Sequence, residues 1–225
     1  MFEEVKGVLA SIGSTIHLAF VLPGISDDRF NDLEDLQRIE VDQHVMKKIS
    51  GVESVDNLSI VAEIDLPWKD ASLEHRKIKR LLGLEGIQDP GNLGTLIRTA
   101  VAFGWDGVFL LPGCCDPFND KALRASRGGV FKIPLISGSW TEFRELVDVN
   151  KLECFAGQPK IEGQEMIKPN SEKPLCLILG SEGPGLSSAS LQIAKPITIP
   201  MVGEMESLNV AVAGGVLMFL MRSSA

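Results

Sequence analysis

The densest group of residues suited to ligand binding is the segment Leu177–Ser187, LILGSEGPGLS. Three glycines and a proline fall between Gly180 and Gly185, directly after an apolar stretch typical of a buried strand. Glycine lets the backbone approach a ligand closely, and α/β proteins bind ligands at the carboxyl ends of their parallel strands. Glu182 adds a carboxylate, which suits a cationic or hydroxyl-bearing ligand better than a phosphate. The segment predicts either a ligand-binding loop or a plain turn between a strand and a helix.

A second segment, Asp89–Gly104 (DPGNLGTLIRTAVAFG), predicts a strand end, a tight turn and a helix. Asn92 is a suitable N-cap for that helix. Five apolar residues with helical spacing then form one buried stripe: Leu93, Leu96, Ile97, Ala100 and Val101. Arg98 points away from the centre of this stripe. Taken alone, it is an ordinary solvated side chain.

The third segment, Ile199–Met221, joins a strand end, a loop with acidic residues and a long apolar helix. Ser207 is the expected N-cap of the helix. Because the helix is apolar on nearly every side, it should be buried within the domain or against another subunit.

Several kinds of site are not supported by the sequence. The four cysteines, Cys114, Cys115, Cys154 and Cys176, lack the spacing of a zinc site, and they are expected to stay reduced; no metal site is predicted. The glycines match neither the dinucleotide fingerprint nor the P-loop. No histidine follows His75 and the chain has no tyrosine, so the usual general bases are missing from the region that holds the three segments.

The surrounding pattern is that of an α/β protein. In the first third, Ile16–Leu22 and Leu58–Ile64 read as strands and Asp32–Ile49 as helical. After Leu81, short apolar runs alternate with helical patterns. The fold expected there is a mostly parallel sheet flanked by helices.

Charge separates the chain into two parts. Residues 1–74 hold 15 acidic and six basic residues, a net of −9, whereas residues 75–225 carry a net of +1. We expect a small acidic α/β domain at 1–70, a linker at 71–80 and a larger domain at 81–225. The basic residues Arg76, Lys77, Lys79 and Arg80 of the linker would either contact RNA phosphates or be simply solvated.

The sequence also carries expectations about location. Its longest apolar run, Val210–Met221, is too short to span a bilayer, and its first residues are acidic where a targeting segment would be basic. A soluble intracellular protein with no membrane partner is expected. Nothing distinguishes the cytoplasm from an organelle.

Taken together, the three segments resemble the three motifs of the SpoU (TrmH-like) branch of the SPOUT RNA methyltransferases. The stretch Ala122–Pro134, ALRASRGGVFKIP, is similar to what the family carries between its first and second motifs. The resemblance covers about 140 residues. It implies transfer of a methyl group from S-adenosyl-L-methionine to a ribose 2′-hydroxyl of RNA, in ribosomal or transfer RNA.

The resemblance also implies a structure. The C-terminal part of the family's domain forms a trefoil knot, and family members are homodimers with the active site at the subunit interface. The residues implied in cofactor binding are Leu179, Gly180, Gly183, Ile199, Met201, Ser207 and Leu208.

The catalytic candidates implied are Arg98 and Asn92 of the first motif, with Glu182 and Asn209 nearby. An arginine is not deprotonated in proteins, so it is a poor general base. We expect Arg98 to stabilise the developing alkoxide or to hold an adjacent phosphate, while a carboxylate or water removes the proton.

The segment Val5–Pro67 resembles, more weakly, the small ribosomal-protein-like domain that precedes the catalytic domain in many SpoU enzymes. It is shorter at its start and more acidic than that pattern, which leaves open an incomplete start and an indirect role in RNA binding. Its presence favours ribosomal over transfer RNA as the substrate.

Three alternatives remain open at this stage. The chain could be a non-catalytic RNA-binding relative, a methyltransferase with a non-RNA acceptor, or a generic nucleotide-binding α/β enzyme. The net charge of −8 favours the second, and the missing nucleotide fingerprints disfavour the third.

Overall fold

The computed structural model of the chain describes residues 15–25, 30, 36–51, 54–55, 60–65, 77–159, 172–181, 183, 185–202 and 206–222. It divides into two compact units, Met1–Asp70 and Ala71–Ala225. Among the described residues, no helix is long and apolar enough to cross a membrane.

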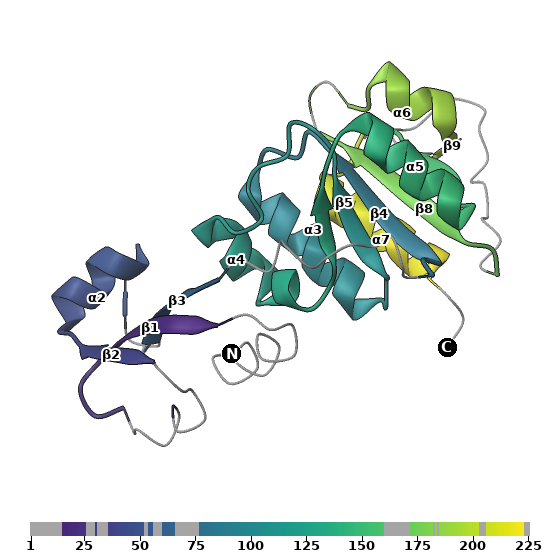
Figure 1. Cartoon of the computed structure of the whole chain (residues 1–225). Helices are drawn as coiled ribbons and strands as arrows, with labels where there is room; N and C mark the ends of the chain where they lie inside the picture. The colour runs from purple at the N-terminus through teal and green to yellow at the C-terminus, as the bar shows by residue number, and fades with distance from the viewer. Residues whose placement is uncertain are drawn as a thin grey trace. The chain divides into compact units, whose positions relative to one another are not determined.

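The N-terminal unit contains a three-stranded sheet in the order β2-β1-β3. Its elements are β1 (Ile16–Val21), β2 (Gln37–Glu40), α2 (Gln43–Ser50) and β3 (Ile60–Ile64) (Figure 1). The prediction of one helical segment from Asp32 to Ile49 is wrong for Gln37–Glu40, which pairs in parallel with β1. The helix begins only where the Asp42 side chain accepts a hydrogen bond from the Val45 N–H, at 2.8 Å.

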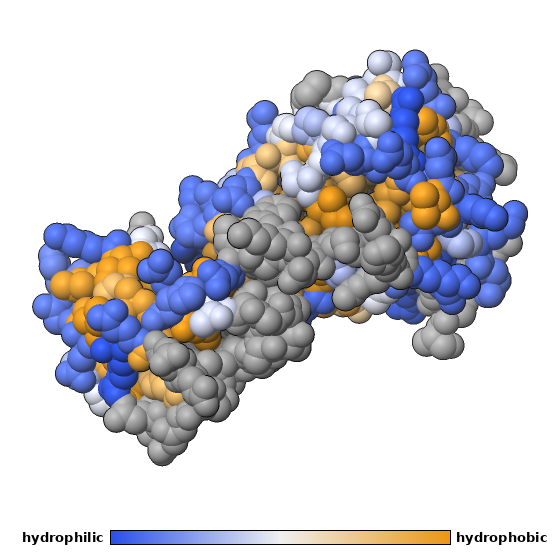
Figure 2. Space-filling view, in the orientation of Figure 1, coloured by the Kyte–Doolittle hydropathy of each residue, from blue (hydrophilic) through white to orange (hydrophobic). Residues whose placement is uncertain are grey.

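Hydrophobic side chains gather on the face of this unit that carries α2 (Figure 2). Val45 and Ile49 of α2 are 38% and 39% exposed. The unit's own small core includes Ala19, Val21 and Phe30.

The C-terminal unit is built on a six-stranded sheet in the order β6-β5-β4-β8-β7-β9, and every pairing among its described strands is parallel. The strands are β4 (Arg80–Glu85), β5 (Gly107–Leu110), β6 (Leu135–Ser137), β7 (Glu153–Gly157), β8 (Leu175–Gly180) and β9 (Lys195–Ile197). The two central strands are apolar over most of their length, Leu81–Leu84 in β4 and Leu175–Leu179 in β8, because helices cover both faces of the sheet. This confirms the expected α/β class.

The helices of this unit are α3 (Pro90–Ala102), α4 (Asp120–Ser126), α5 (Trp140–Asn150), α6 (Ser188–Ile193) and α7 (Val210–Met221), with a 3₁₀ turn, η4, at Gly129–Phe131. In Figure 1, α5 lies in front of the sheet and α7 behind it. Helices α5 and α6 pack onto a core that contains Phe109, Phe143 and Ile178. On the other face, α7 packs against α3 and β8.

Two helix starts differ from the expectation. Helix α3 begins at Pro90, and its N-cap is Asp89, whose carboxylate accepts a hydrogen bond from the Asn92 N–H at 2.7 Å. Proline suits this first helical position because its missing N–H needs no partner there. Helix α7 is capped by Asn209 rather than Ser207, since the Asn209 side chain accepts from the Ala211 and Val212 N–H groups. Neither Asn92 nor Ser207 is therefore the N-cap of its helix.

Arg80 is buried in the sheet, so neither expectation for the linker, contact with RNA phosphates or a solvated side chain, holds for this residue. It is the first residue of β4 and is only 2% exposed. Its guanidinium donates hydrogen bonds to the carbonyls of Met221, Lys79 and Lys173 at 2.7–2.9 Å. Burial lowers the pKa of Arg80, and the charges of Asp106 and Glu172 oppose that shift. Arg80 thus joins the end of α7 to the sheet.

Candidate active site

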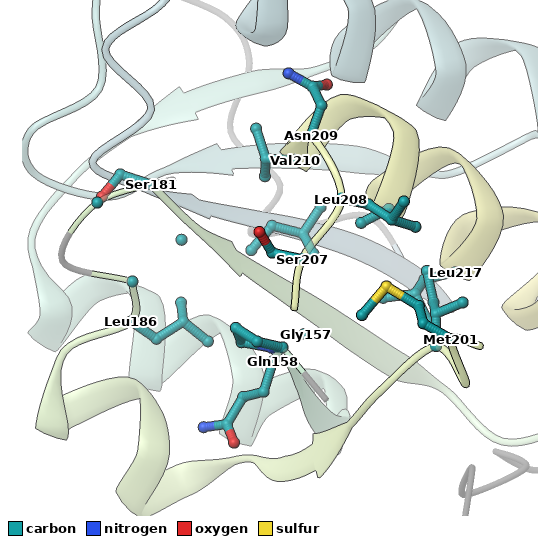
Figure 3. Close-up of a pocket in the computed structure, with 17 residues that line it drawn as sticks. Gly157, Gln158, Ser181, Leu186, Met201, Ser207, Leu208, Asn209, Val210 and Leu217 are labelled. Atoms are coloured by element: carbon teal, nitrogen blue, oxygen red, sulfur yellow. The ribbon is translucent and has the colours of Figure 1, made fainter. Parts of the chain in front are cut away.

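A cavity of about 470 Å³ lies at the carboxyl ends of β7 and β8, beside the first turns of α7. The segments that line it are the end of β7, the loop after β8, and the stretch from β9 into α7. In Figure 3, Met201 and Leu217 lie at one end of the cavity, and Ser181 and Leu186 lie at the other. Pockets for small molecules and cofactors have volumes of roughly 300–1,000 Å³. The cavity is large enough for a ligand of this class.

The seven residues expected to contact the cofactor all line this cavity, although they come from separate segments: Leu179, Gly180, Gly183, Ile199, Met201, Ser207 and Leu208. The folding of the chain thus brings the second and third motifs to one place. That each of the seven contacts a cofactor stays a prediction.

The loop after β8 needs glycine at Gly180 and Gly185. A Cβ atom on Gly180 would lie 2.7 Å from the carbonyl carbon and oxygen of Gly185, too close for any side chain. Gly185 has a φ of +70°, in the left-handed region. Ser181 and Gly185 also form a β-bridge. The loop is therefore folded tightly back on itself, with backbone groups close to the cavity.

The apolar wall of the cavity is packed closely against the helices and sheet. Beta carbons on Gly157 and Gly214 would each lie 2.7 Å from a methyl group of Leu179, and one on Gly214 would also lie 2.4 Å from Leu96. Any side chain at these glycines would displace Leu179, which lines the cavity. The shape of this wall thus depends on two small residues far apart in sequence.

Two of the four catalytic candidates lie together. The Asn209 side chain donates a hydrogen bond to Asn92 Oδ1 at 3.0 Å, while it caps α7. In Figure 3 the Asn209 side chain points away from the cavity, although the residue lines it. The bond joins the first turn of α3 to the entry of α7. Glu182 lies outside the described residues.

Arg98 is exposed on α3 and is not among the described residues that line the cavity. It follows Asn92 by six residues, which corresponds to about 9 Å along a helix axis. Gly129 packs on its backbone, because a Cβ there would lie 3.3 Å from Arg98 Cα. Within one chain, Arg98 thus lies outside the cavity, although its helix α3 packs against α7, which lines the cavity.

Cys114 lies at the same edge of the sheet, in the loop after β5. Its thiol donates a hydrogen bond to the Leu84 carbonyl at 3.2 Å. Burial raises the pKa of this thiol from 9.0 to about 11, although hydrogen bonds with the backbone of Ile87 and Gly86 oppose the shift. The protonated thiol is a poor nucleophile at neutral pH.

Sequence reasoning missed part of the cavity lining. Gly157 and Gln158, at the end of β7, are in none of the three segments, yet they line the cavity. A signal existed, because Gly157 ends an apolar run that reads as a parallel strand, and ligands bind at such ends. Among the described residues, no group of three or more His, Cys, Asp or Glu is arranged to hold a metal ion.

Comparison with known proteins places this geometry in a family. Residues 79–219 match the SpoU rRNA Methylase family. The chain is 36% identical over 178 residues to the 23S rRNA (guanosine(2553)-2′-O)-methyltransferase RlmP of Bacillus subtilis, covering 75% of this chain and 71% of the relative. It is 28% identical to the 23S rRNA (guanosine-2′-O-)-methyltransferase RlmB of Haemophilus ducreyi, covering 97% and 96%.

A solved structure is similar over nearly the whole chain. The AdoMet-bound rRNA methyltransferase from Sinorhizobium meliloti superimposes with a TM-score of 0.83 at 26% identity, covering 96% of this chain and 83% of that one. The family match spans both the segments that line the cavity and the helix that carries Arg98. The chain belongs to the SpoU rRNA methylase family.

Proposed function

We propose that this protein is an S-adenosyl-L-methionine-dependent RNA methyltransferase that methylates a ribose 2′-hydroxyl. The observation that carries the proposal is the cavity of about 470 Å³ in which the second and third motifs meet. Both relatives reported above are named as ribose 2′-O-methyltransferases.

The cavity fits S-adenosyl-L-methionine in chemistry as well as in size. Its apolar side chains, including Leu179, Leu186 and Met201, suit the purine ring and the carbons around the sulfonium. The glycine-rich loop after β8 offers backbone N–H and C=O groups to the polar edges of such a ligand. The similar structure from Sinorhizobium meliloti is that of an AdoMet-bound rRNA methyltransferase.

The bound cofactor would supply a methyl group activated by a positively charged sulfur. The protein must hold the RNA hydroxyl in line with it and stabilise the charge that develops on that oxygen. Arg98 provides an exposed cation for the second task, as a partner of the alkoxide or of the neighbouring phosphate. Glu182 or a water molecule accepts the proton, because a guanidinium does not.

Asn92 and Asn209 act together in this proposal. Their hydrogen bond of 3.0 Å joins the helix that carries Arg98 to the helix that lines the cavity. The pair thus sets the position of α3, which carries Arg98 towards the RNA, relative to the cofactor.

The surface beside Arg98 is suited to RNA. From Lys121 to Lys132 every charged residue is basic, and Lys121, Arg124, Arg127 and Lys132 are all exposed. Glycines at positions 94 and 129 bring this stretch close to α3, since a Cβ on Gly94 would lie 2.4 Å from the Ala122 carbonyl oxygen. We name these four residues the basic stretch. Lys121, Arg127 and Lys132 contact RNA phosphates together with Arg124, whose guanidinium also pairs with Asp120 at 2.7 Å, and this accounts for RNA binding by a chain with a net charge of −8.

The active enzyme is a homodimer, with the active site at the interface. Four apolar side chains of α7 are 39–54% exposed: Val212, Val216, Phe219 and Leu220. Such an apolar strip on a helix favours burial against a second copy. A twofold partner would also bring a second Arg98 into the neighbourhood of the cavity, which the arginine of the same chain does not line.

The finer features of the fold follow from the same proposal. The C-terminal segment forms a trefoil knot, supported by the position of Ile199, Met201 and Ser207–Asn209, which line the cavity together with the loop after β8. The N-terminal unit binds the substrate, which is ribosomal RNA in preference to transfer RNA, because the relatives reported above are named for rRNA. An enzyme acting on this substrate works inside the cell.

Two measurements test the proposal. Isothermal titration with S-adenosyl-L-methionine should show one site per chain, and absence of binding would rule out the enzyme in favour of a non-catalytic relative. Mapping of 2′-O-methylation in total RNA, from cells with and without the protein, should reveal a modified ribose. If transfer RNA alone changes, the preference for ribosomal RNA is wrong.

A further inference from the structure

Glu85, the last residue of β4, is outside the cavity lining but contacts both ends of the loop that forms part of it. In the sheet, Glu85 is the register partner of Gly180, where the loop begins. Its carboxylate accepts a hydrogen bond from the Ser187 N–H at 3.1 Å, where the loop ends and α6 starts. Glu85 therefore connects β4 to both ends of the loop Ser181–Leu186.

The carboxylate has a second, stronger partner. Ser190 Oγ donates to the same oxygen, Glu85 Oε2, at 2.6 Å, and Ser190 is completely buried. Short hydrogen bonds to an ionised acceptor are about twice as strong as neutral ones. Ser190 is also held to Ser187, because its N–H donates to Ser187 Oγ at 3.4 Å. The first turn of α6 is thereby fixed to β4 through a carboxylate from a different part of the chain.

We propose that Glu85 is a positioning residue for the cofactor, which holds the loop Ser181–Leu186 in the shape that binds S-adenosyl-L-methionine. This inference rests on the proposed function. Ser181, Gly183, Gly185 and Leu186 line the cavity, so the geometry of the loop decides which backbone groups face the ligand. Fixing the loop before binding removes an entropic cost that would otherwise weaken affinity.

The test compares Glu85→Ala, Glu85→Gln and Ser190→Ala by titration with S-adenosyl-L-methionine. Glu85→Ala removes both hydrogen bonds, so the Kd should rise on the order of tenfold to a hundredfold. Glu85→Gln keeps an acceptor oxygen and should restore the Kd to within about threefold of wild type. Ser190→Ala removes one of the two hydrogen bonds, so the Kd should rise by less than in Glu85→Ala. Since the bonds share one oxygen, the double variant Glu85→Ala/Ser190→Ala should bind no worse than Glu85→Ala.

Glu142 provides a matched control. Its Oε2 atom also accepts two hydrogen bonds, here from the N–H and the Oγ of Ser139, both at 2.7 Å, and these bonds cap α5. Glu142→Ala should lower thermal stability while leaving the Kd for the cofactor unchanged. A Kd change equal to that of Glu85→Ala would mean that general loss of stability explains both, and would overturn the inference.

Other outcomes separate this inference from the proposed function. Wild-type protein that binds no cofactor contradicts the proposed function itself. Wild-type binding together with a Glu85→Ala Kd within twofold of it leaves that function intact and refutes only the role of Glu85. If Glu85→Ala does not fold, Ser190→Ala alone decides, and an unchanged Kd for that variant counts against the inference.

Discussion

At the scale of single residues, the chemistry that we propose depends on a charge that lies outside the cavity. Arg98 is exposed on α3, and the cavity is lined instead by glycines, apolar side chains and a few polar groups. Binding of the cofactor and stabilisation of the reacting hydroxyl are therefore assigned to different residues. Substitutions should separate the two functions.

Replacing Arg98 with alanine should reduce methyl transfer by about a hundredfold or more, as when a charge-stabilising group is removed from an active site. The Kd for S-adenosyl-L-methionine should stay within about twofold of wild type, because the side chain does not line the cavity. Transfer of radiolabelled methyl groups to RNA and isothermal titration measure the two quantities. Loss of cofactor affinity in this variant would contradict the assignment.

Cys114 should make the stability of the protein depend on alkaline pH. Burial raises the pKa of its thiol to about 11 from 9.0, so the folded state holds this proton more tightly than the unfolded state. The resulting stabilisation is complete below about pH 9 and is lost as the pH rises towards 11. Urea unfolding between pH 8 and 11 should show a steeper loss for wild type than for Cys114→Ala. Equal slopes would mean that the thiol is not protected from ionisation.

At the scale of elements, the end of α4 combines an unusual backbone conformation with a positive charge. Arg127 has a φ of +49°, in the left-handed region that favours glycine, and it is exposed beside the Gly129 turn that packs on Arg98. Residues in strained backbone conformations cluster at functional sites. Here the function that we propose is contact with RNA.

Arg127→Gly should therefore stabilise the protein and weaken RNA binding. Relief of the left-handed strain should raise the free energy of unfolding by about 0.5–1 kcal/mol, while loss of one phosphate contact should reduce the slope of log K against log salt by about 1. Lys151 is the control, since it caps α5 with a φ of +53° and is not part of the basic stretch. Lys151→Gly should give the same stabilisation with unchanged RNA affinity. An equal loss of affinity in both variants would count against the basic stretch.

At the scale of the whole molecule, α7 joins three functions. It lines the cavity with its first turns, packs on α3 through Gly214, and leaves an apolar strip exposed. Its end is held to β4 by the buried Arg80. In the homodimer that we propose, this helix would link cofactor binding to assembly.

Disrupting the exposed strip should disrupt the dimer. Val212 and Val216 lie one turn apart on α7 and are 54% and 39% exposed, so Val212→Asp/Val216→Asp places two charges on the strip with little effect on the buried side of the helix. We expect a monomer in sedimentation equilibrium and little or no methyl transfer. The matched surface variant Val149→Asp, at a 72% exposed site on α5, should remain dimeric. A wild-type protein that is already monomeric would contradict the proposed assembly.

The sequence by itself determined the fold class, the family and the residues that line most of the cavity. These follow from local patterns: apolar runs at strand spacing, a glycine-rich loop after one of them, and three motifs in a fixed order. Local signals were less reliable at the helix starts. Asp89 and Asn209, rather than Asn92 and Ser207, cap α3 and α7, because several suitable capping residues stand close together and only the backbone geometry selects one.

The tertiary structure decided which distant residues meet. The carboxylate of Glu85 reaches Ser187 and Ser190 more than one hundred positions away, and Arg80 is buried although it belongs to a basic, polar stretch. Periodicity carries no information about such pairings, since they depend on the order of strands in the sheet. The glycines of the loop after β8 mark it in the sequence as part of a ligand site. For the same reason, the role that we propose for Glu85 in holding this loop follows only from the folded chain.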